Sequence, residues 1–259
     1  MQTLDTIAAL RGALAPLREG ATVALVATMG ALHEGHETLL ARAVAECDVV
    51  VASVFVNPAQ FGDLADLDAY PRDLGGDAAR AEACGVDLLF APAAAELYPP
   101  GFATWVEPGG AAEGLEGERR PGHFRAVATV CVKLFMIVRP DVAYFGRKDA
   151  QQVAVLKQVV SDLDLEVEIR AVETVRDRDG LAFSSRNARL SAAERRAAAA
   201  IPQALATGDA SRARALLDGV GIEVEYVEVR DLDGPTLALA VRVGQTRLID
   251  SASLGSDRS

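Results

Sequence analysis

Two histidines three residues apart, His33 and His36, are well suited to act on a phosphate group. They stand in the stretch Val23–Arg42, VALVATMGALHEGHETLLAR, which reads as a strand, a short loop and a helix. Their spacing puts both imidazoles on one side of the first helical turn. Gly30 and Gly35 have no Cβ, so phosphate oxygens could approach backbone N–H groups at the positive end of the helix dipole. The stretch therefore predicts a polyphosphate site.

The same histidines have other interpretations. Two histidines three apart can cap a helix or bind a metal ion, and a glycine between them can serve a turn alone. The chain has only 3 histidines in 259 residues. That two of them directly follow a hydrophobic strand favours the phosphate site.

A lysine follows a second predicted strand. Gly146-Arg147-Lys148-Asp149 comes between the short apolar run Asp141–Phe145 and a predicted helix at Ala150–Val160. Lys148 could meet a phosphate there, and Asp149 could bind magnesium or a hydroxyl. The alternative is that Asp149 caps the helix and Lys148 is simply exposed.

The sequence Ser184-Ser185-Arg186-Asn187 is a further phosphate candidate. Both serines offer hydroxyl and backbone donors, and Arg186 offers a planar, permanently charged fork. A serine that caps a helix is the alternative. Together the three segments would bring histidine, lysine and arginine to the carboxyl ends of parallel strands, where open α/β sheets bind ligands.

Composition limits the classes of function. The net charge of −11 and the pI near 4.8 argue against a nucleic-acid surface. Cys47, Cys84 and Cys131 lack the spacing of metal ligands, which favours buried free thiols in a reducing compartment, the cytoplasm. The N-terminus does not resemble a signal peptide, and no apolar run is long enough to span a membrane. We therefore expect neither a nucleic acid nor a membrane as a partner.

Hydrophobic periodicity predicts an α/β fold, a Rossmann-like parallel sheet with helices on both faces. The expected helices before residue 140 are Leu4–Glu19, about Glu37–Ala45, Asp73–Cys84 and Ala126–Ile137. The expected strands up to residue 172 are Thr22–Ala27, Asp48–Phe55, Val86–Phe90, Ala103–Glu107, Asp141–Phe145 and Glu166–Val172. Gly114–Arg125 is expected to form a mobile loop whose arginines, including Arg119, Arg120 and Arg125, either meet phosphate or are solvated.

The C-terminal part of the chain predicts a smaller α+β domain that acts as a lid. A helical run after Leu190 and a helix at Ser211–Val220 precede alternating stretches at Ile222–Val229, Thr236–Val243 and Thr246–Ile249, which suggest an antiparallel sheet. The last residues, SLGSDRS, are expected to fray. We place the boundary so that residues 1–174 bind nucleotide and the second substrate and residues 175–259 form the lid.

Several segments together resemble one family. TMGALHEGH, SVFVNPAQFG, DLDAYPRDL, RPGHFRAVATV, DVAYFGRKDAQQ, DGLAFSSRNARLS and VRVGQTRLID are similar, in this order, to successive blocks of pantothenate synthetase, or pantoate–β-alanine ligase. That family belongs to the nucleotidylyl-transferase superfamily, with which the His-x-Gly-His signature is shared. The resemblance covers most of residues 22–190 and the extreme C-terminus.

This resemblance implies a ligase of pantothenate biosynthesis. ATP would activate (R)-pantoate as pantoyl adenylate, which β-alanine then attacks to give pantothenate and AMP. ATP is thus a substrate, Mg²⁺ the accompanying ion, and a cytoplasmic homodimer the expected assembly. The alternatives are another nucleotidylyltransferase of the superfamily and a nucleotide-binding pseudoenzyme.

The resemblance also assigns residues. His36, as proton donor, would act with His33, Lys148 and Arg186 in catalysis. Pantoate and β-alanine would be bound by Gln60, Gln152 and Asn57, although such glutamines are ordinarily just solvated. No side-chain cage for a metal is expected. The ATP-binding residues would be Met29, Gly30, His33, His36, Gly146, Lys148, Asp149, Val175, Phe183, Ser184, Ser185 and Arg186.

The chain departs from the family pattern at several positions. Ala27 stands where proline is usual, Ala126 where glycine is usual and Arg147 where an acidic residue is usual. Phe183 precedes the two serines where methionine or leucine is common, and Ala192–Val224 is shorter than expected. None of these departures removes a side chain assigned to catalysis.

Overall fold

The computed structural model describes residues 1–255, which form two compact units. The first unit comprises Met1–Phe145 and Val155–Val172; the second comprises Gly146–Ala154 and the chain from Glu173 onward. A division after residue 174 thus takes no account of Gly146–Ala154, which belong with the second unit. Of the C-terminal run SLGSDRS, the last four residues lie outside the described part.

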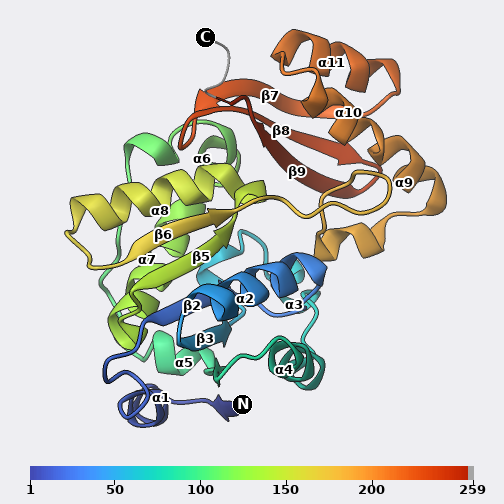
Figure 1. The fold of residues 1–259 in the computed structure, drawn as a ribbon. Helices are drawn as coiled ribbons and strands as arrows, with labels where there is room; N and C mark the ends of the chain where they lie inside the picture. Colours follow the sequence, from blue (N-terminus) through green and yellow to red (C-terminus); the bar gives the residue numbers. More distant parts are fainter. Residues whose placement is uncertain (256–259) are drawn as a thin grey trace. The chain divides into compact units, whose positions relative to one another are not determined.

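The first unit is built on a six-stranded parallel sheet with the strand order β1-β4-β3-β2-β5-β6 (Figure 1). Most strands form where runs of β-branched and apolar residues predict them, and β3 is buried over nearly its whole length because both faces of the sheet are covered. The strands are β1 (Gln2–Leu4), β2 (Val23–Thr28), β3 (Val49–Val54), β4 (Leu88–Phe90), β5 (Val142–Gly146) and β6 (Glu168–Val172). The predicted fold class is confirmed.

Helices cover both faces of this sheet (Figure 1). On one face, Leu39 and Leu40 of α2 (Glu34–Glu46) and Ala81 of α4 (Leu74–Ala83) pack on side chains such as Val26 of β2. On the other face, α1 (Ile7–Leu14) and α7 (His123–Val138) contact each other as well as β4 and β2. Short helices complete the connections: α3 (Leu64–Asp68), α5 (Ala94–Leu97), α6 (Leu115–Arg119) and the single turns η1 (Pro58–Gln60) and η2 (Gly110–Ala112).

The strand order reverses direction at β2. The chain proceeds from β2 through β3 to β4 on one side, and then returns to place β5 on the other side of β2. Open parallel sheets bind ligands beyond the carboxyl ends of strands at such a switch point. The loop that carries His33 follows the carboxyl end of β2 directly.

The second unit contains a three-stranded antiparallel sheet, β7 (Glu223–Asp231), β8 (Pro235–Val243) and β9 (Thr246–Ser253). Ile201 and Leu205 of α10 (Ala200–Ala206) and Leu217 of α11 (Ala210–Gly219) pack against buried residues of β8 such as Leu239. This is the α+β arrangement that the sequence predicts. The unit also contains η3 (Arg147–Asp149), the start of α8 (Ala150–Asp162), η4 (Ser185–Arg189) and α9 (Ala192–Ala198).

Two elements predicted from the sequence are wrong. The helix expected at Leu4–Glu19 is shorter, since Leu4 pairs with Phe90 in the sheet and Thr6 caps the helix. At its other end, Pro16 has no backbone N–H with which to continue the helical hydrogen bonds. The strand expected at Ala103–Glu107 is absent. The Val106 N–H donates to the hydroxyl of Thr129 (3.0 Å) instead of to a neighbouring strand.

The loop expected at Gly114–Arg125 contains helical structure. Gly114 has φ 70° and precedes α6, and Gly122 has φ 77° and precedes α7. Leu115 and Glu116 anchor α6, with 4% and 5% of their surfaces exposed. The two glycines therefore each precede the start of a helix and do not indicate a long loop.

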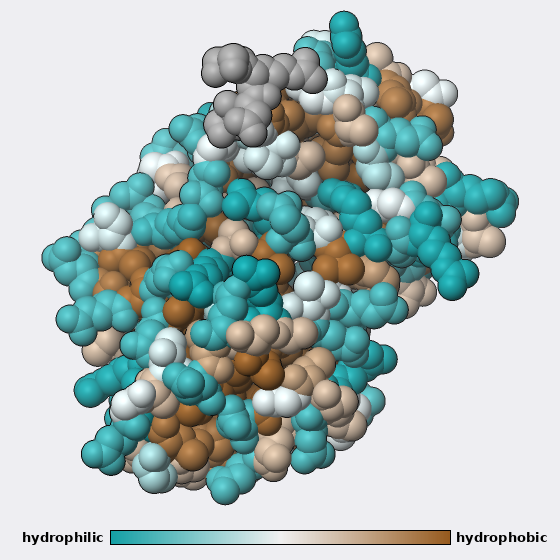
Figure 2. Space-filling view, viewed as in Figure 1, coloured by the Kyte–Doolittle hydropathy of each residue, from teal (hydrophilic) through white to brown (hydrophobic). Residues whose placement is uncertain are grey.

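The three cysteines form no disulfide, but only Cys131 is buried; Cys47 and Cys84 are half-buried. Burial raises the pKa of the Cys131 thiol to about 12. None of the helices within residues 1–255 has the length and apolar character that crossing a membrane requires. On the face drawn in Figure 2, hydrophobic residues lie in separate groups among hydrophilic ones.

A polar network inside the first unit makes stability depend on pH. Tyr144 donates to Glu46 Oε2 (2.8 Å), and this bond, followed by that from Arg170, lowers the pKa of Glu46 below its usual 4.5. A carboxyl with a lowered folded-state pKa adds stability above its unfolded pKa and loses it as the pH falls through the folded value.

We expect Tyr144→Phe to lower the free energy of unfolding. The difference from the parent chain should be full above a pH of about 4.5 and should narrow below it. Urea denaturation of both proteins at about pH 7 and about pH 3 measures this. A difference that stays constant over this range would contradict the role of Tyr144.

Candidate active site

The two histidines lie together at the start of α2. His33 is the N-cap residue and His36 the third residue of the helix, and their ring centroids are 4.1 Å apart. The helix begins at Glu34, three residues before the predicted start, so Gly35 is inside it. The prediction that both imidazoles share one side of the first turn is confirmed.

A hydrogen bond selects the tautomer of His36. Its Nδ1 accepts from the backbone N–H of His33 (3.3 Å). In the neutral ring the proton is then on Nε2, because the two ring nitrogens divide the donor and acceptor roles. His36 can therefore donate through Nε2.

The loop before the histidines is held by Asp77, which the sequence analysis missed. Asp77, 4% exposed on α4, accepts from the N–H groups of Ala31 (Oδ2, 3.0 Å) and Leu32 (Oδ1, 2.7 Å). Ala31 has φ 52° and Gly30 has φ 81°, a region that favours glycine. A Cβ on Gly30 would come within 2.7 Å of Asp77 Oδ2, so the glycine is required by close approach as well. The clue in the sequence was the position of Asp77, four residues before the buried Ala81 on the inner face of α4.

Asp77→Asn is expected to destabilise the protein by about 1–3 kcal/mol, because one of the two N–H groups would then face an amide NH₂ instead of an acceptor. Equilibrium urea denaturation measures the change. Glu82→Gln on the same helix is the matched control, since Glu82 has 66% of its side chain exposed and its loss should cost less than about 0.5 kcal/mol. Equal effects of both changes would contradict a special role of Asp77.

Asn57 and Gln60, which follow β3, are joined by a side-chain hydrogen bond. Asn57 is fully buried; its Nδ2 donates to Gln60 Oε1 (2.8 Å) and to Ala126 O (3.3 Å), and its Oδ1 accepts from Ala59 N–H (3.3 Å). Asn57 thus orients Gln60. Since Gln60 Oε1 accepts this bond, its Nε2 is the group suited to donate to a ligand carboxylate or hydroxyl. Ala126, where glycine was expected, is fully buried and supplies one of these carbonyls.

Lys148 lies in the second unit, on η3. Its side chain is 20% exposed and its Nζ is 3.7 Å from Asp149 Oδ1, so the alternative of a freely exposed lysine does not hold. Arg147, noted above as a departure from the pattern of the resembled family, forms ion pairs with Glu173 (3.0 Å) and Asp233 (3.6 Å). The positive charge of Arg147 is thus balanced by two carboxylates of the same unit.

Ser184 is a cap, as the alternative interpretation held. Its Oγ accepts from the N–H of Arg186 (3.3 Å) at the start of η4. The preceding Phe183 N–H donates to Val175 O (3.1 Å), and Asn187 Nδ2 donates to Ala182 O (2.9 Å). The segment is therefore an ordered turn closed by its own backbone and side-chain bonds.

One pocket of the second unit brings several predicted residues together. It is lined by Lys148, Ser184, Arg186 and Asn187, and also by Arg247 and Asp250, which the sequence analysis did not single out. Three cationic side chains, a hydroxyl and an amide, against the single carboxylate of Asp250, suit an anionic ligand with several oxygens. The other assigned residues of this unit do not line the pocket: Gly146, Asp149, Gln152, Val175, Phe183 and Ser185. Met29, Gly30, His33, His36, Asn57 and Gln60 belong to the first unit.

The described residues contain no group of three or more His, Cys, Asp or Glu side chains that could hold a metal ion. The carboxylate of Asp149 is an oxygen donor next to Lys148. Such a single carboxylate fits Mg²⁺ that is bound mainly by phosphates and water.

Comparison with known proteins gives one consistent result. The family model of pantoate-beta-alanine ligase matches residues 2–253. Pantothenate synthetase from Roseiflexus sp. (strain RS-1) is 49% identical over 278 residues, covering 98% of this chain and 99% of the relative. The enzyme from Heliobacterium modesticaldum is 50% identical over 263 residues, covering 90% and 92%. Because the first alignment is longer than the 259 residues of this chain, that relative contains segments which this chain lacks. That they fall in Ala192–Val224 stays a prediction.

Solved structures agree. Pantothenate synthetase from Thermus thermophilus matches with a TM-score of 0.91 and 42% identity, covering 98% of this chain and 99% of the other. The pantoate-beta-alanine ligase from Francisella tularensis, complexed with beta-gamma ATP and beta-alanine, matches with a TM-score of 0.89 and 34% identity, covering 98% of both. The chain therefore belongs to the pantoate–β-alanine ligase family and is a ligase of pantothenate biosynthesis.

Proposed function

We propose that the chain condenses (R)-pantoate with β-alanine to pantothenate through a pantoyl-adenylate intermediate, releasing AMP and pyrophosphate, as a step of coenzyme A biosynthesis. The observation that carries this proposal is the pocket lined by Lys148, Ser184 and Arg186 in a member of this ligase family. The Francisella relative, complexed with beta-gamma ATP and beta-alanine, supports the assignment of the substrates.

In the first step, a carboxylate oxygen of pantoate attacks the α-phosphorus of ATP, and the bond to the bridging oxygen of pyrophosphate breaks. Negative charge builds up on the phosphate oxygens and on the leaving pyrophosphate. Donors fixed in advance stabilise such charge best, because they need no reorganisation during the reaction. We assign this role to His33, His36, Lys148 and Arg186, with Nε2–H of His36 as the proton donor.

The remaining assigned residues bind rather than react. Backbone N–H groups near Met29 and Gly30, together with Gly146, Asp149, Val175, Phe183, Ser184 and Ser185, would contact ATP. Gln60, oriented by Asn57, and Gln152 would bind pantoate through its hydroxyl and carboxylate oxygens. In the second step the amine of β-alanine attacks the acyl carbon, AMP leaves with the bonding electron pair, and the amine loses a proton.

Magnesium, when bound, neutralises charge on the phosphates of ATP. Asp149 is the residue of this chain that would hold it, directly or through a water molecule. The site is also proposed to work in the cytoplasm and in a homodimer, both of which are carried over from the family resemblance. Sedimentation analysis of the purified chain would test the dimer.

The decisive experiment is product analysis. Purified protein with magnesium, ATP, pantoate and β-alanine should form AMP and pantothenate in equal amounts. Exchange of labelled pyrophosphate into ATP should require pantoate but not β-alanine, because the adenylate forms before the amine enters. A product that retains the AMP group would instead indicate a nucleotidylyltransferase, and no turnover at all would indicate a pseudoenzyme.

A further inference from the structure

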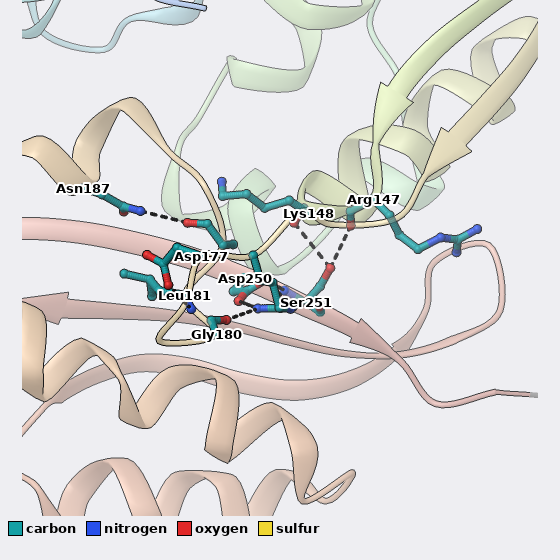
Figure 3. Close-up of polar contacts among 10 residues, drawn as sticks. Arg147, Lys148, Asp177, Gly180, Leu181, Asn187, Asp250 and Ser251 are labelled. Carbon is teal, nitrogen blue, oxygen red and sulfur yellow. Dashed lines mark hydrogen bonds and ion pairs between the residues drawn. The ribbon is translucent and has the colours of Figure 1, made fainter. Parts of the chain in front are cut away.

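Two adjacent residues of β9, Asp250 and Ser251, are polar and buried, with 3% and 5% of their surfaces exposed. Neither is among the residues assigned above to catalysis or binding. Both contact segments of the second unit that carry proposed phosphate ligands (Figure 3). Buried polar side chains need hydrogen-bond partners, and the partners of these two show which segments they fix in place.

Ser251 holds the turn that carries Lys148. Its hydroxyl donates to Arg147 O (2.9 Å) and also lies 3.3 Å from Lys148 O. Because a hydroxyl has one proton, this is a single bond shared by two successive carbonyls of η3. The backbone on both sides of the Lys148 Cα is thereby fixed to β9.

Asp250 holds the hairpin that leads to Ser184. Its carboxylate pairs with Arg176 in a two-pronged geometry, with Nη1 to Oδ2 at 2.6 Å and Nη2 to Oδ1 at 3.2 Å. Arg176 also donates to Gly180 O (3.1 Å) and to Ser251 O (3.3 Å), and its backbone forms a bridge with Ala182. Two residues beyond this bridge the chain reaches Ser184.

A buried ion pair of this kind is a poor source of stability. Burial raises the pKa of Asp250 although the charges of Arg176 and Lys148 act against it. Well-packed apolar residues would often be at least as stable as such a pair, whereas its directional bonds fix the relative placement of the groups that it joins. Asp250 also lines the pocket together with Lys148, Ser184 and Arg186.

We propose that Asp250 and Ser251 are positioning residues that hold Lys148 and the Ser184–Arg186 segment in the arrangement that the phosphates of ATP require. This inference rests on the function proposed above. It assigns to the C-terminal strand a part in adenylate formation, exerted through Lys148 and Arg186.

The test compares Ser251→Ala and Asp250→Asn with Thr236→Val, measured in the full-length protein by pantoate-dependent pyrophosphate exchange. Thr236 is the matched control, because it is also buried in this sheet and its hydroxyl donates to a nearby carbonyl of its own hairpin, Gly234 O (2.9 Å). We expect each β9 variant to lose kcat by about tenfold or more, since small displacements of catalytic groups are costly. The KM for β-alanine, measured separately in the complete reaction, should not change. Thr236→Val should lower Tm by about as much as the β9 variants do, but it should leave kcat unchanged.

A double-mutant cycle with Lys148→Ala separates positioning from general stability. If Ser251 acts through Lys148, then Ser251→Ala should cost less than about twofold in the Lys148→Ala background. Equal losses in both backgrounds would overturn the inference, as would a full kcat in Ser251→Ala when Lys148→Ala is impaired. Full activity of Lys148→Ala itself would instead refute the proposed function at this residue.

Discussion

Replacing His36 by alanine is expected to slow pantoate-dependent pyrophosphate exchange by about 100-fold, the loss typical of one fixed donor to a developing charge. His36 is suited to this role because its Nδ1 is occupied by the His33 N–H, which leaves the proton on Nε2. Single-turnover measurement of adenylate formation shows the effect directly, without contribution from the second step.

The control for His36→Ala is Glu34→Ala, in the same first turn of α2 but with an exposed side chain. It should retain the parent rate. His36→Ala with near-normal adenylate formation would show that the phosphates of ATP do not meet this ring.

Lys148→Ala is the second change with a large expected effect, again about 100-fold in adenylate formation. The ammonium lies in a pocket with Arg186, where water is partly excluded and a charge acts more strongly than at the surface. Lys148→Arg keeps the charge but replaces a compact ammonium by a planar fork, so we expect it to restore only part of the rate.

Lys157→Ala is the control for Lys148→Ala. Lys157 lies on α8, the helix that follows Lys148, and its replacement removes one positive charge from the chain but none from the pocket. It should leave adenylate formation unchanged. If Lys148→Ala and Lys157→Ala behaved alike, the effect would come from net charge rather than from contact with phosphate.

The sequence was informative where structure is determined locally. The run at Val49–Val54 is rich in valine, as expected for a strand covered on both faces, and the spacing of His33 and His36 matches the helical turn that they begin. Ser184 shows the limit of such reasoning, because the same local pattern serves a cap and a ligand site, and the serine is both a cap and part of the pocket lining.

The residues that the sequence analysis missed act over long separations. Asp77 binds the backbone of Leu32, 45 residues earlier, and Ser251 binds the carbonyl of Arg147, 104 residues earlier. No periodicity in one segment indicates a partner in another. The same reason explains the missed edge strand β1, whose three residues gain their conformation from pairing with β4.

The division of the chain has a consequence for cutting it into fragments. Gly146–Ala154 belong to the second unit although the first unit continues after them at Val155–Val172. A fragment that begins at residue 175 would contain Ser251 without the carbonyls of Arg147 and Lys148 to which its hydroxyl donates. A fragment that ends at residue 172 would carry residues 146–154 without the strand that holds them. The second unit is thus not a detachable module, and swapping it between relatives requires two exchanged segments, one of them only nine residues long.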